Sequence, residues 1–168
     1  MTIRLARMED LEVSFAIVKD ATKHMDKQGI PQWDDIYPEE ATLLQDIEKQ
    51  EMYVIEQDSR AVGIIVLNDE QSPEYASIPW KYAGRVLVVH RLTISPTYQN
   101  RGLASYLMKF AEDAAAVRAY NCVRLDAFTQ NPAAVTFYDR RGYRKAGIVH
   151  FRKGEFFCYE KAIKAEFR

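Results

Sequence analysis

Residues 86–114 constrain the fold most strongly, because they predict a strand, a tight turn and a helix in direct succession. The segment opens with the apolar run Val86-Leu87-Val88-Val89, which predicts a buried strand that continues to Ile94. Pro96 ends this strand because it cannot donate a ladder hydrogen bond. After Gly102, apolar residues recur every three or four positions and predict a helix whose first turn borders the preceding loop.

The loop of residues 99–104 has the features of a binding site for an anion such as a pyrophosphate. The first N–H groups of a helix have no intrahelical partner, and the helix dipole is positive at that end. Gly102 allows a ligand to approach the backbone closely, and Arg101 adds a cation. Neither the P-loop pattern nor the dinucleotide pattern Gly-x-Gly-x-x-Gly occurs in the sequence. Nucleotide hydrolysis and hydride transfer therefore lose support.

Length and composition predict one domain over residues 1–168 with a small molecule as partner. The content of 48% hydrophobic and 28% charged residues is typical of a soluble globular protein. The net charge of −1, without a basic stripe, argues against nucleic acid or a membrane as partner. Cys122 and Cys158 form neither a disulfide framework nor a metal-ligand pattern, so no metal is expected. The absence of a signal peptide and of an apolar span predicts a cytoplasmic protein.

Periodicity along the whole chain predicts the element order β-α-α-β-β-β-α-β-α-β-β. Strands at residues 52–57 and 61–67 are close enough to form an antiparallel hairpin. A strand at residues 122–128 follows the central helix, and this unit requires a parallel pair. Asn131 and Pro132 are typical of a helix start. The other elements are strands at 2–7, 143–151 and 156–162 and helices that begin near Glu9 and Glu39.

Two predicted loops are unusual because they carry large aromatic residues. Residues 27–37 contain Trp33 and Tyr37, and residues 68–84 contain Tyr75, Trp80 and Tyr82. Such rings either contact a ligand or pack the loop against the core. The second loop is long enough to be a functional flap.

Two motifs resemble those of the GCN5-related N-acetyltransferase (GNAT) family. The first, residues 99–104 with the sequence Gln-Asn-Arg-Gly-Leu-Ala, is similar to the segment Gln/Arg-x-x-Gly-x-Gly/Ala, whose amides hold the coenzyme A pyrophosphate. The second resembles Asn-x-x-Ala-x-x-Leu/Phe-Tyr-x-x-x-Gly-Phe/Tyr and lies at the right distance downstream. It matches at Asn131, Ala134, Phe137, Tyr138, Gly142 and Tyr143. Both motifs lie on the expected element types, and the resemblance covers nearly all of the chain.

The resemblance implies an α/β (α+β) fold with a GNAT-like mixed, mostly antiparallel twisted sheet and helices on both faces. The central parallel pair is splayed at the cofactor site, where free backbone groups can pair with the pantetheine arm. Acetyl-CoA is then the acyl donor. The residues implied in its binding are Leu92, Thr93, Ile94, Gln99, Asn100, Arg101, Gly102, Leu103, Ala104, Ser105, Asn131 and Tyr138.

The resemblance also implies direct transfer of the acetyl group to an amine. Tyr138 is then the acid that protonates the departing thiolate, although a tyrosine of this helix could also simply pack on the core. The base has three candidates. His90 resembles a histidine of arylalkylamine N-acetyltransferases, where it assists amine deprotonation, and imidazole titrates in the right range. Asp126 is the reserve candidate or a structural partner of Arg124 or Arg91, and water alone could suffice.

The predicted acceptor is a primary amine of a small molecule, with a protein or peptide as the alternative. Trp33, Asp34, Asp35 and Tyr37 combine two rings with two carboxylates, which favours a cationic acceptor. An equal alternative is that the carboxylates are solvated loop charges and Trp33 is a packing anchor. A coenzyme A-binding sensor without catalysis is the alternative from another class. Acceptor identity and oligomeric state, a homodimer included, stay open.

Overall fold

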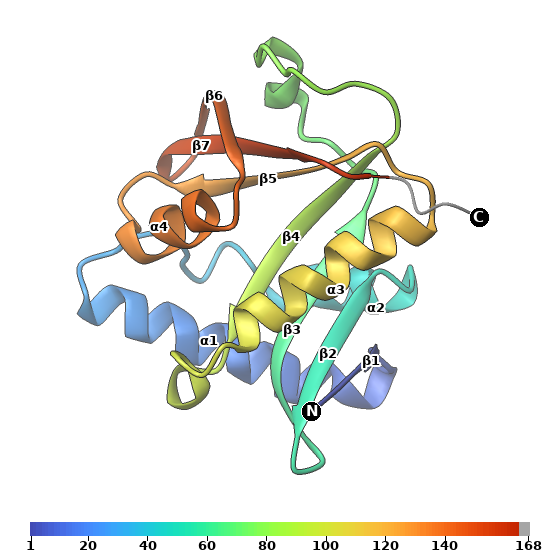
Figure 1. The fold of residues 1–168 in the computed structure, drawn as a ribbon. Coiled ribbons are helices and arrows are strands. Elements are labelled where there is room, and N and C mark those ends of the chain that lie inside the picture. The colour runs from blue at the N-terminus through green and yellow to red at the C-terminus, as the bar shows by residue number, and fades with distance from the viewer. Residues whose placement is uncertain (165–168) are drawn as a thin grey trace. The chain divides into compact units, whose positions relative to one another are not determined.

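The computed structural model describes residues 1–164, and Figure 1 shows its helices and strands as a ribbon. It divides into two compact units. The first unit comprises Met1–Leu67 and His90–Phe110, and the second comprises Asn68–Val89 and the described residues from Ala111 onward. Strand β4 (Val86–Ile94) and helix α3 (Leu103–Val117) each pass from one unit into the other. The expectation of one acetyltransferase domain stays a prediction.

The first unit contains an antiparallel ladder of three strands with two helices. Strand β1 (Thr2–Leu5) pairs with β2 (Met52–Gln57), and β2 pairs with β3 (Arg60–Asn68). The predicted hairpin is therefore confirmed. A short 3-10 helix, η1 (Met8–Asp10), precedes α1 (Leu11–Lys27), and α2 (Glu40–Glu48) follows the first aromatic loop. The 3-10 turn η3 (Pro96–Tyr98) follows β4.

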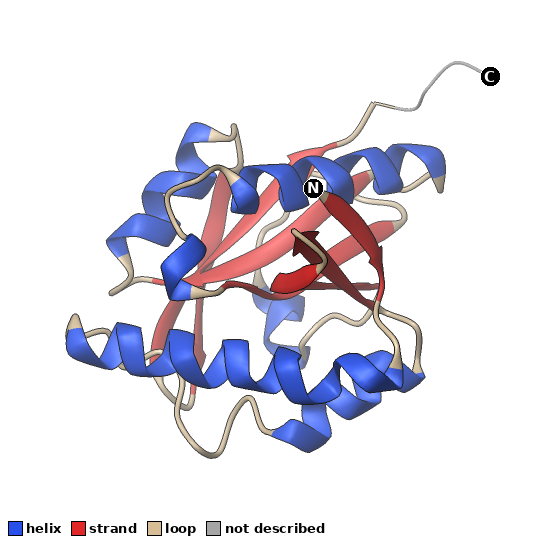
Figure 2. Cartoon of the chain, turned by 90° about the horizontal axis from the view of Figure 1, so that it is seen from below, coloured by secondary structure: helices blue, strands red, loops and turns tan. Residues whose placement is uncertain are grey.

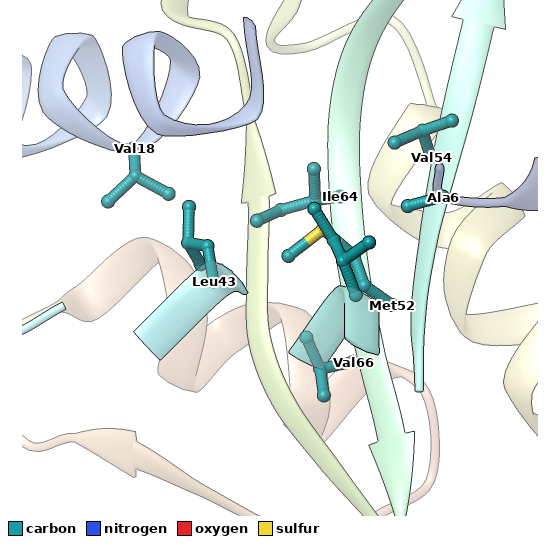
Figure 3. Packing of buried hydrophobic residues seen from close by; sticks show 8 residues of the cluster. Ala6, Val18, Leu43, Met52, Val54, Ile64 and Val66 are labelled. Atoms are coloured by element: carbon teal, nitrogen blue, oxygen red, sulfur yellow. The ribbon is translucent and has the colours of Figure 1, made fainter. Parts of the chain in front are cut away.

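The core of the first unit lies where alternate residues of β2 and β3 meet α1 and α2 (Figure 3). Its buried residues are Ala6, Val18, Leu43, Ile47, Met52, Val54, Ile64 and Val66. The strand period of two places Tyr53 on the opposite side of β2 from Val54. There its ring contacts Phe110 of α3, with the ring centroids 4.9 Å apart. Helices therefore cover both faces of these strands, as Figure 2 shows.

The second unit is built around β5 (Cys122–Phe128). The start of β4 runs parallel to it, with pairs from Val86↔Cys122 to Val88↔Arg124, as predicted. On its other side β5 pairs antiparallel with β7 (Gly154–Ala162), which pairs antiparallel with β6 (Arg144–Phe151). Helix α4 (Pro132–Arg140) connects β5 and β6, and the 3-10 turn η2 (Pro73–Ser77) lies in the second aromatic loop.

The strand order of the sheet is β1-β2-β3-β4-β5-β7-β6, with β4–β5 as its parallel pair. The predicted mixed, mostly antiparallel sheet and the predicted order of strands and α-helices are confirmed. The closing turn is shorter than predicted. Phe151 pairs with Gly154, so that only two residues form the turn and Gly154 begins β7. Among the described residues, no helix is long and apolar enough to cross a membrane.

Candidate active site

The predicted pyrophosphate loop has a backbone suited to an anion. Asn100 and Gly102 adopt positive φ values of 63° and 80°, which turn the chain sharply before α3. The N–H of Tyr106 donates to the carbonyl oxygen of Gly102 at 3.0 Å, so the amides before Tyr106 have no partner within the helix. A Cβ atom at Gly102 would meet no heavy atom within 4 Å. The open space beside these amides fits the binding of a phosphate group.

Two side chains of this loop make contacts with neighbouring residues of the chain. The Gln99 Nε2 atom donates to the carbonyl oxygen of Ile94 at 3.2 Å, which ties the loop to the end of β4. The Arg101 guanidinium lies 5.0 Å from the centroid of the Tyr98 ring, and Arg101 is exposed. Gln99 therefore contributes to the shape of the loop, and Arg101 stays accessible to solvent.

The end of β4 departs from regular strand geometry at Arg91. Its φ of 50° lies in the left-handed region, which a residue other than glycine rarely adopts. The Arg91 guanidinium bonds to both oxygens of Asp46 at 2.6 and 2.7 Å and to the Tyr37 hydroxyl at 2.8 Å. His90, half-buried, directly precedes this distortion. Such strain is often retained at functional sites.

Close packing between β3 and β4 positions the predicted pantetheine segment. A Cβ atom at Gly63 would lie 2.7 Å from Ile94 Cδ1 and 3.0 Å from the carbonyl oxygen of Thr93. Only glycine permits this approach without a shift of the neighbouring strand. Thr93 and Ile94 are buried, whereas Leu92 is half-buried.

The predicted acceptor residues are held by contacts within the first unit. Trp33 is half-buried and packs against the core cluster of this unit. The Asp34 Oδ1 atom accepts hydrogen bonds from the N–H groups of Ile36 and Tyr37 at 3.0 and 3.2 Å. The Tyr37 hydroxyl accepts from the Arg91 guanidinium. These contacts give the loop a defined conformation, and the role of the three residues in binding an acceptor stays a prediction.

The partner of Asp126 in the second unit is Tyr75. The Tyr75 hydroxyl donates to Asp126 Oδ2 at 2.6 Å. Arg124 instead donates to Gln71 and to the carbonyl oxygen of Tyr82, at 2.6 and 2.7 Å. The sequence suggests Arg124 or Arg91 as a structural partner of Asp126. The structure instead pairs Asp126 with a neutral hydroxyl, that of Tyr75. Burial raises the pKa of Asp126 to about 6, against the opposing effect of the hydrogen bond from Tyr75.

The second motif places Asn131 and Tyr138 at the two ends of α4. Asn131 Oδ1 accepts from the N–H of Ala134 at 3.2 Å, so the predicted N-cap is confirmed. Tyr138 is buried, and its ring lies 5.6 Å from that of Tyr159 and 5.9 Å from that of Tyr143. Burial, and next the charge of Asp126, raise the pKa of the Tyr138 hydroxyl above its ordinary value. Tyr138 therefore stays protonated at neutral pH.

Comparison with known proteins identifies the family. The model of the acetyltransferase (GNAT) family matches residues 17–143, which include both motifs. No curated protein matches the sequence significantly. The chain belongs to the GNAT family: it is an N-acetyltransferase of the class that uses acetyl-CoA as acyl donor.

Solved structures share the fold at low sequence identity. A GNAT family acetyltransferase from Streptococcus agalactiae is 24% identical with a TM-score of 0.86, covering 97% of this chain and 95% of that one. PaiA N-acetyltransferase from Thermoplasma acidophilum, solved in complex with coenzyme A, is 20% identical with a TM-score of 0.73 and coverages of 96% and 98%. The ribosomal-protein-S18-alanine N-acetyltransferase from Escherichia coli is 16% identical with a TM-score of 0.72 and coverages of 99% and 96%.

Two polar contacts near the predicted sites are not foreseeable from the sequence, that of Tyr75 with Asp126 and that of Arg91 with Asp46. In the sequence Tyr75 is one of several rings of the second loop, and its bond to Asp126 joins residues 51 positions apart. Nothing in the sequence around Asp46, which is predicted to lie on a helix, indicates Arg91 as its partner, because Arg91 lies 45 positions away. A polar residue on the buried side of a short helix was the available hint, because such a residue needs a partner.

Proposed function

We propose that the chain transfers the acetyl group of acetyl-CoA to a primary amine of a small molecule by direct attack on the thioester. The observation that carries this proposal is the place of Tyr138, a buried residue of α4 that occupies the tyrosine position of the second motif, within the residues that the family model matches. A protonated hydroxyl suits a general acid for a departing thiolate. Direct transfer needs no covalent enzyme intermediate, since orientation of the two substrates supplies much of the rate.

In the first unit, the proposed donor site uses backbone groups. The amides from Asn100 to Ser105 would hold the pyrophosphate, because the turn at Gly102 leaves them without helical partners. The backbone of residues 92–94 would pair with the pantetheine arm as a strand edge pairs with a peptide. Acetyl-CoA supplies the activated acyl group, and the protein residues bind and orient it.

In the second unit, the proposed proton transfers involve side chains of β5 and α4. Tyr138 would donate its proton to the thiolate. Asp126 would accept a proton from the amine, and its pKa of about 6 leaves it largely ionised at neutral pH. His90 in the first unit is the alternative base. Asn131 is proposed to contact the pantetheine while its Oδ1 caps α4.

A protein or peptide N-terminus is the second candidate acceptor. The fold similarity to the ribosomal-protein-S18-alanine N-acetyltransferase from Escherichia coli favours it, although fold alone does not determine the acceptor. A screen should therefore include small amines, polyamines and short peptides, with release of free thiol as the signal. Acetylation of peptides but not of small amines would replace the first proposal with the second.

The role of Tyr138 can be tested with two matched substitutions. Tyr138→Phe is expected to keep the fold and the affinity for acetyl-CoA but to lower kcat roughly tenfold or more, as loss of a general acid does. Tyr143→Phe is the control, because it removes a neighbouring buried hydroxyl at a position where the family motif accepts phenylalanine. A Tyr138→Phe variant with wild-type turnover would show that another group protonates the thiolate.

A further inference from the structure

A single hydrogen bond from Tyr75 holds one oxygen of the Asp126 carboxylate. Tyr75 belongs to η2 and is only 3% exposed, and its hydroxyl lies 2.6 Å from Asp126 Oδ2. Within residues 1–164, the Oδ1 atom of Asp126 has no hydrogen bond. The carboxylate is therefore fixed at one oxygen and free at the other.

The position of the Tyr75 hydroxyl is itself determined by further contacts. The Trp80 indole Nε1 donates to the carbonyl oxygen of Tyr75 at 2.9 Å, and the two ring centroids are 5.3 Å apart. The Arg124 guanidinium lies 4.1 Å from the centroid of the Trp80 ring. The buried carboxylate of Glu160 accepts from two N–H groups of the same loop, those of Lys81 and Tyr82, at 2.8 and 3.0 Å. The loop is thus anchored to β5 before Trp80 in the sequence and to β7 directly after it.

Asp126 has no cationic partner in the described part of the second unit. The groups around it are Tyr75 from η2, Tyr138 from α4, Cys158 opposite it on β7 and Arg124 on its own strand. Only Arg124 is charged positively, and its hydrogen bonds go to Gln71 and Tyr82. Asp126 is half-buried, and its unbonded Oδ1 atom reaches solvent, so an ammonium group could replace water there and pair with the carboxylate. A carboxylate with a raised pKa and an unused acceptor oxygen is typical of functional sites.

We propose that Tyr75 is a positioning residue, which fixes Asp126 so that its free oxygen binds the ammonium group of the acceptor and takes a proton from it. The inference rests on the proposed function and names its substrate class, amines that are cationic at neutral pH. An N–H bond of the ammonium group breaks and an O–H bond forms on Asp126. The lone pair left on nitrogen forms the bond to the acetyl carbonyl carbon, the C–S bond breaks, and the sulfur takes the proton of Tyr138 as the thiol leaves. The nitrogen then loses a second proton to the Tyr138 oxygen, which gives the amide and restores the hydroxyl, and Asp126 releases its proton to solvent.

The pH profile of kcat/KM separates this role from simple packing. Tyr75→Phe removes a hydrogen bond that favours the ionised carboxylate, so the pKa of Asp126 should rise. The acidic limb, expected near pH 6 in the wild type, should move about one unit toward higher pH. The KM for acetyl-CoA should not change. Tyr82→Phe is the matched control, because Tyr82 contributes only backbone atoms to hydrogen bonds in this loop, and it should keep the wild-type profile.

Carbon-13 NMR of the Asp126 carboxyl group gives a second readout that needs no acceptor. The carboxyl should titrate near pH 6 in the wild type and at higher pH in Tyr75→Phe, and Asp126→Asn identifies the signal. An unchanged titration in a folded Tyr75→Phe variant would overturn the positioning role of Tyr75. If acidic amines gave the highest activity, the proposed class of cationic acceptors would be wrong. A wild-type protein that releases no thiol with any amine would contradict the proposed function, while the titration would still decide the role of Tyr75.

Discussion

Replacement of Asp46 by asparagine should destabilise the protein strongly, because it breaks a buried ion pair. The side chains of Arg91 and Asp46 are 11% and 7% exposed, and two hydrogen bonds of 2.6 and 2.7 Å join them. Asp46→Asn removes the negative charge and leaves the guanidinium with neutral partners, the new amide and the Tyr37 hydroxyl. Loss of one member of a buried pair typically costs about 3–5 kcal/mol. The amide oxygen can still accept one bond, so about 3 kcal/mol is expected.

The assay is urea unfolding at pH 7 followed by circular dichroism. In thermal unfolding, a loss of about 3 kcal/mol in a chain of this size corresponds to a Tm lowered by about 6–12 °C. Glu9→Gln is the control, because Glu9 pairs with Arg7 at 3.0 Å while the two side chains are 70% and 63% exposed. Exposed pairs contribute about 0–1 kcal/mol. If both variants lose the same small amount of unfolding free energy, the Arg91–Asp46 pair does not stabilise the first unit.

Three further substitutions test the proposed sites. Gly102→Val should weaken acetyl-CoA binding roughly tenfold, as measured by calorimetry. The reason is that a β-branched residue is strained at φ 80° and its side chain enters the open space beside the amides. Unchanged affinity in a folded variant would exclude this loop as the pyrophosphate site. His90→Gln should retain the acidic limb of the pH profile if Asp126 is the base. Loss of the acidic limb in this variant would assign the role of base to His90. Trp33→Ala should raise KM for the amine without changing acetyl-CoA affinity, and an effect on stability alone would make Trp33 a packing residue of its core cluster.

Local signals in the sequence determined the element order. The periods of two and 3.6 residues, the proline after β4 and the Asn131–Pro132 helix start act within a few residues, so a sequence alone reveals them. The structure confirmed each of these elements, including the cap from Asn131 to Ala134. The two family motifs are also local, which is why the sequence alone indicates the family.

Only the tertiary structure decided which polar groups meet. Sequence suggested Arg124 or Arg91 beside Asp126, but the hydroxyl of Tyr75 lies there, and Arg91 pairs with Asp46 instead. Periodicity shows which face of an element is buried but not which distant side chain lies opposite, because that depends on register and on the path of the loops. The pKa of Asp126 follows from the same long-range packing, since burial of its carboxyl group by separate segments is what raises it.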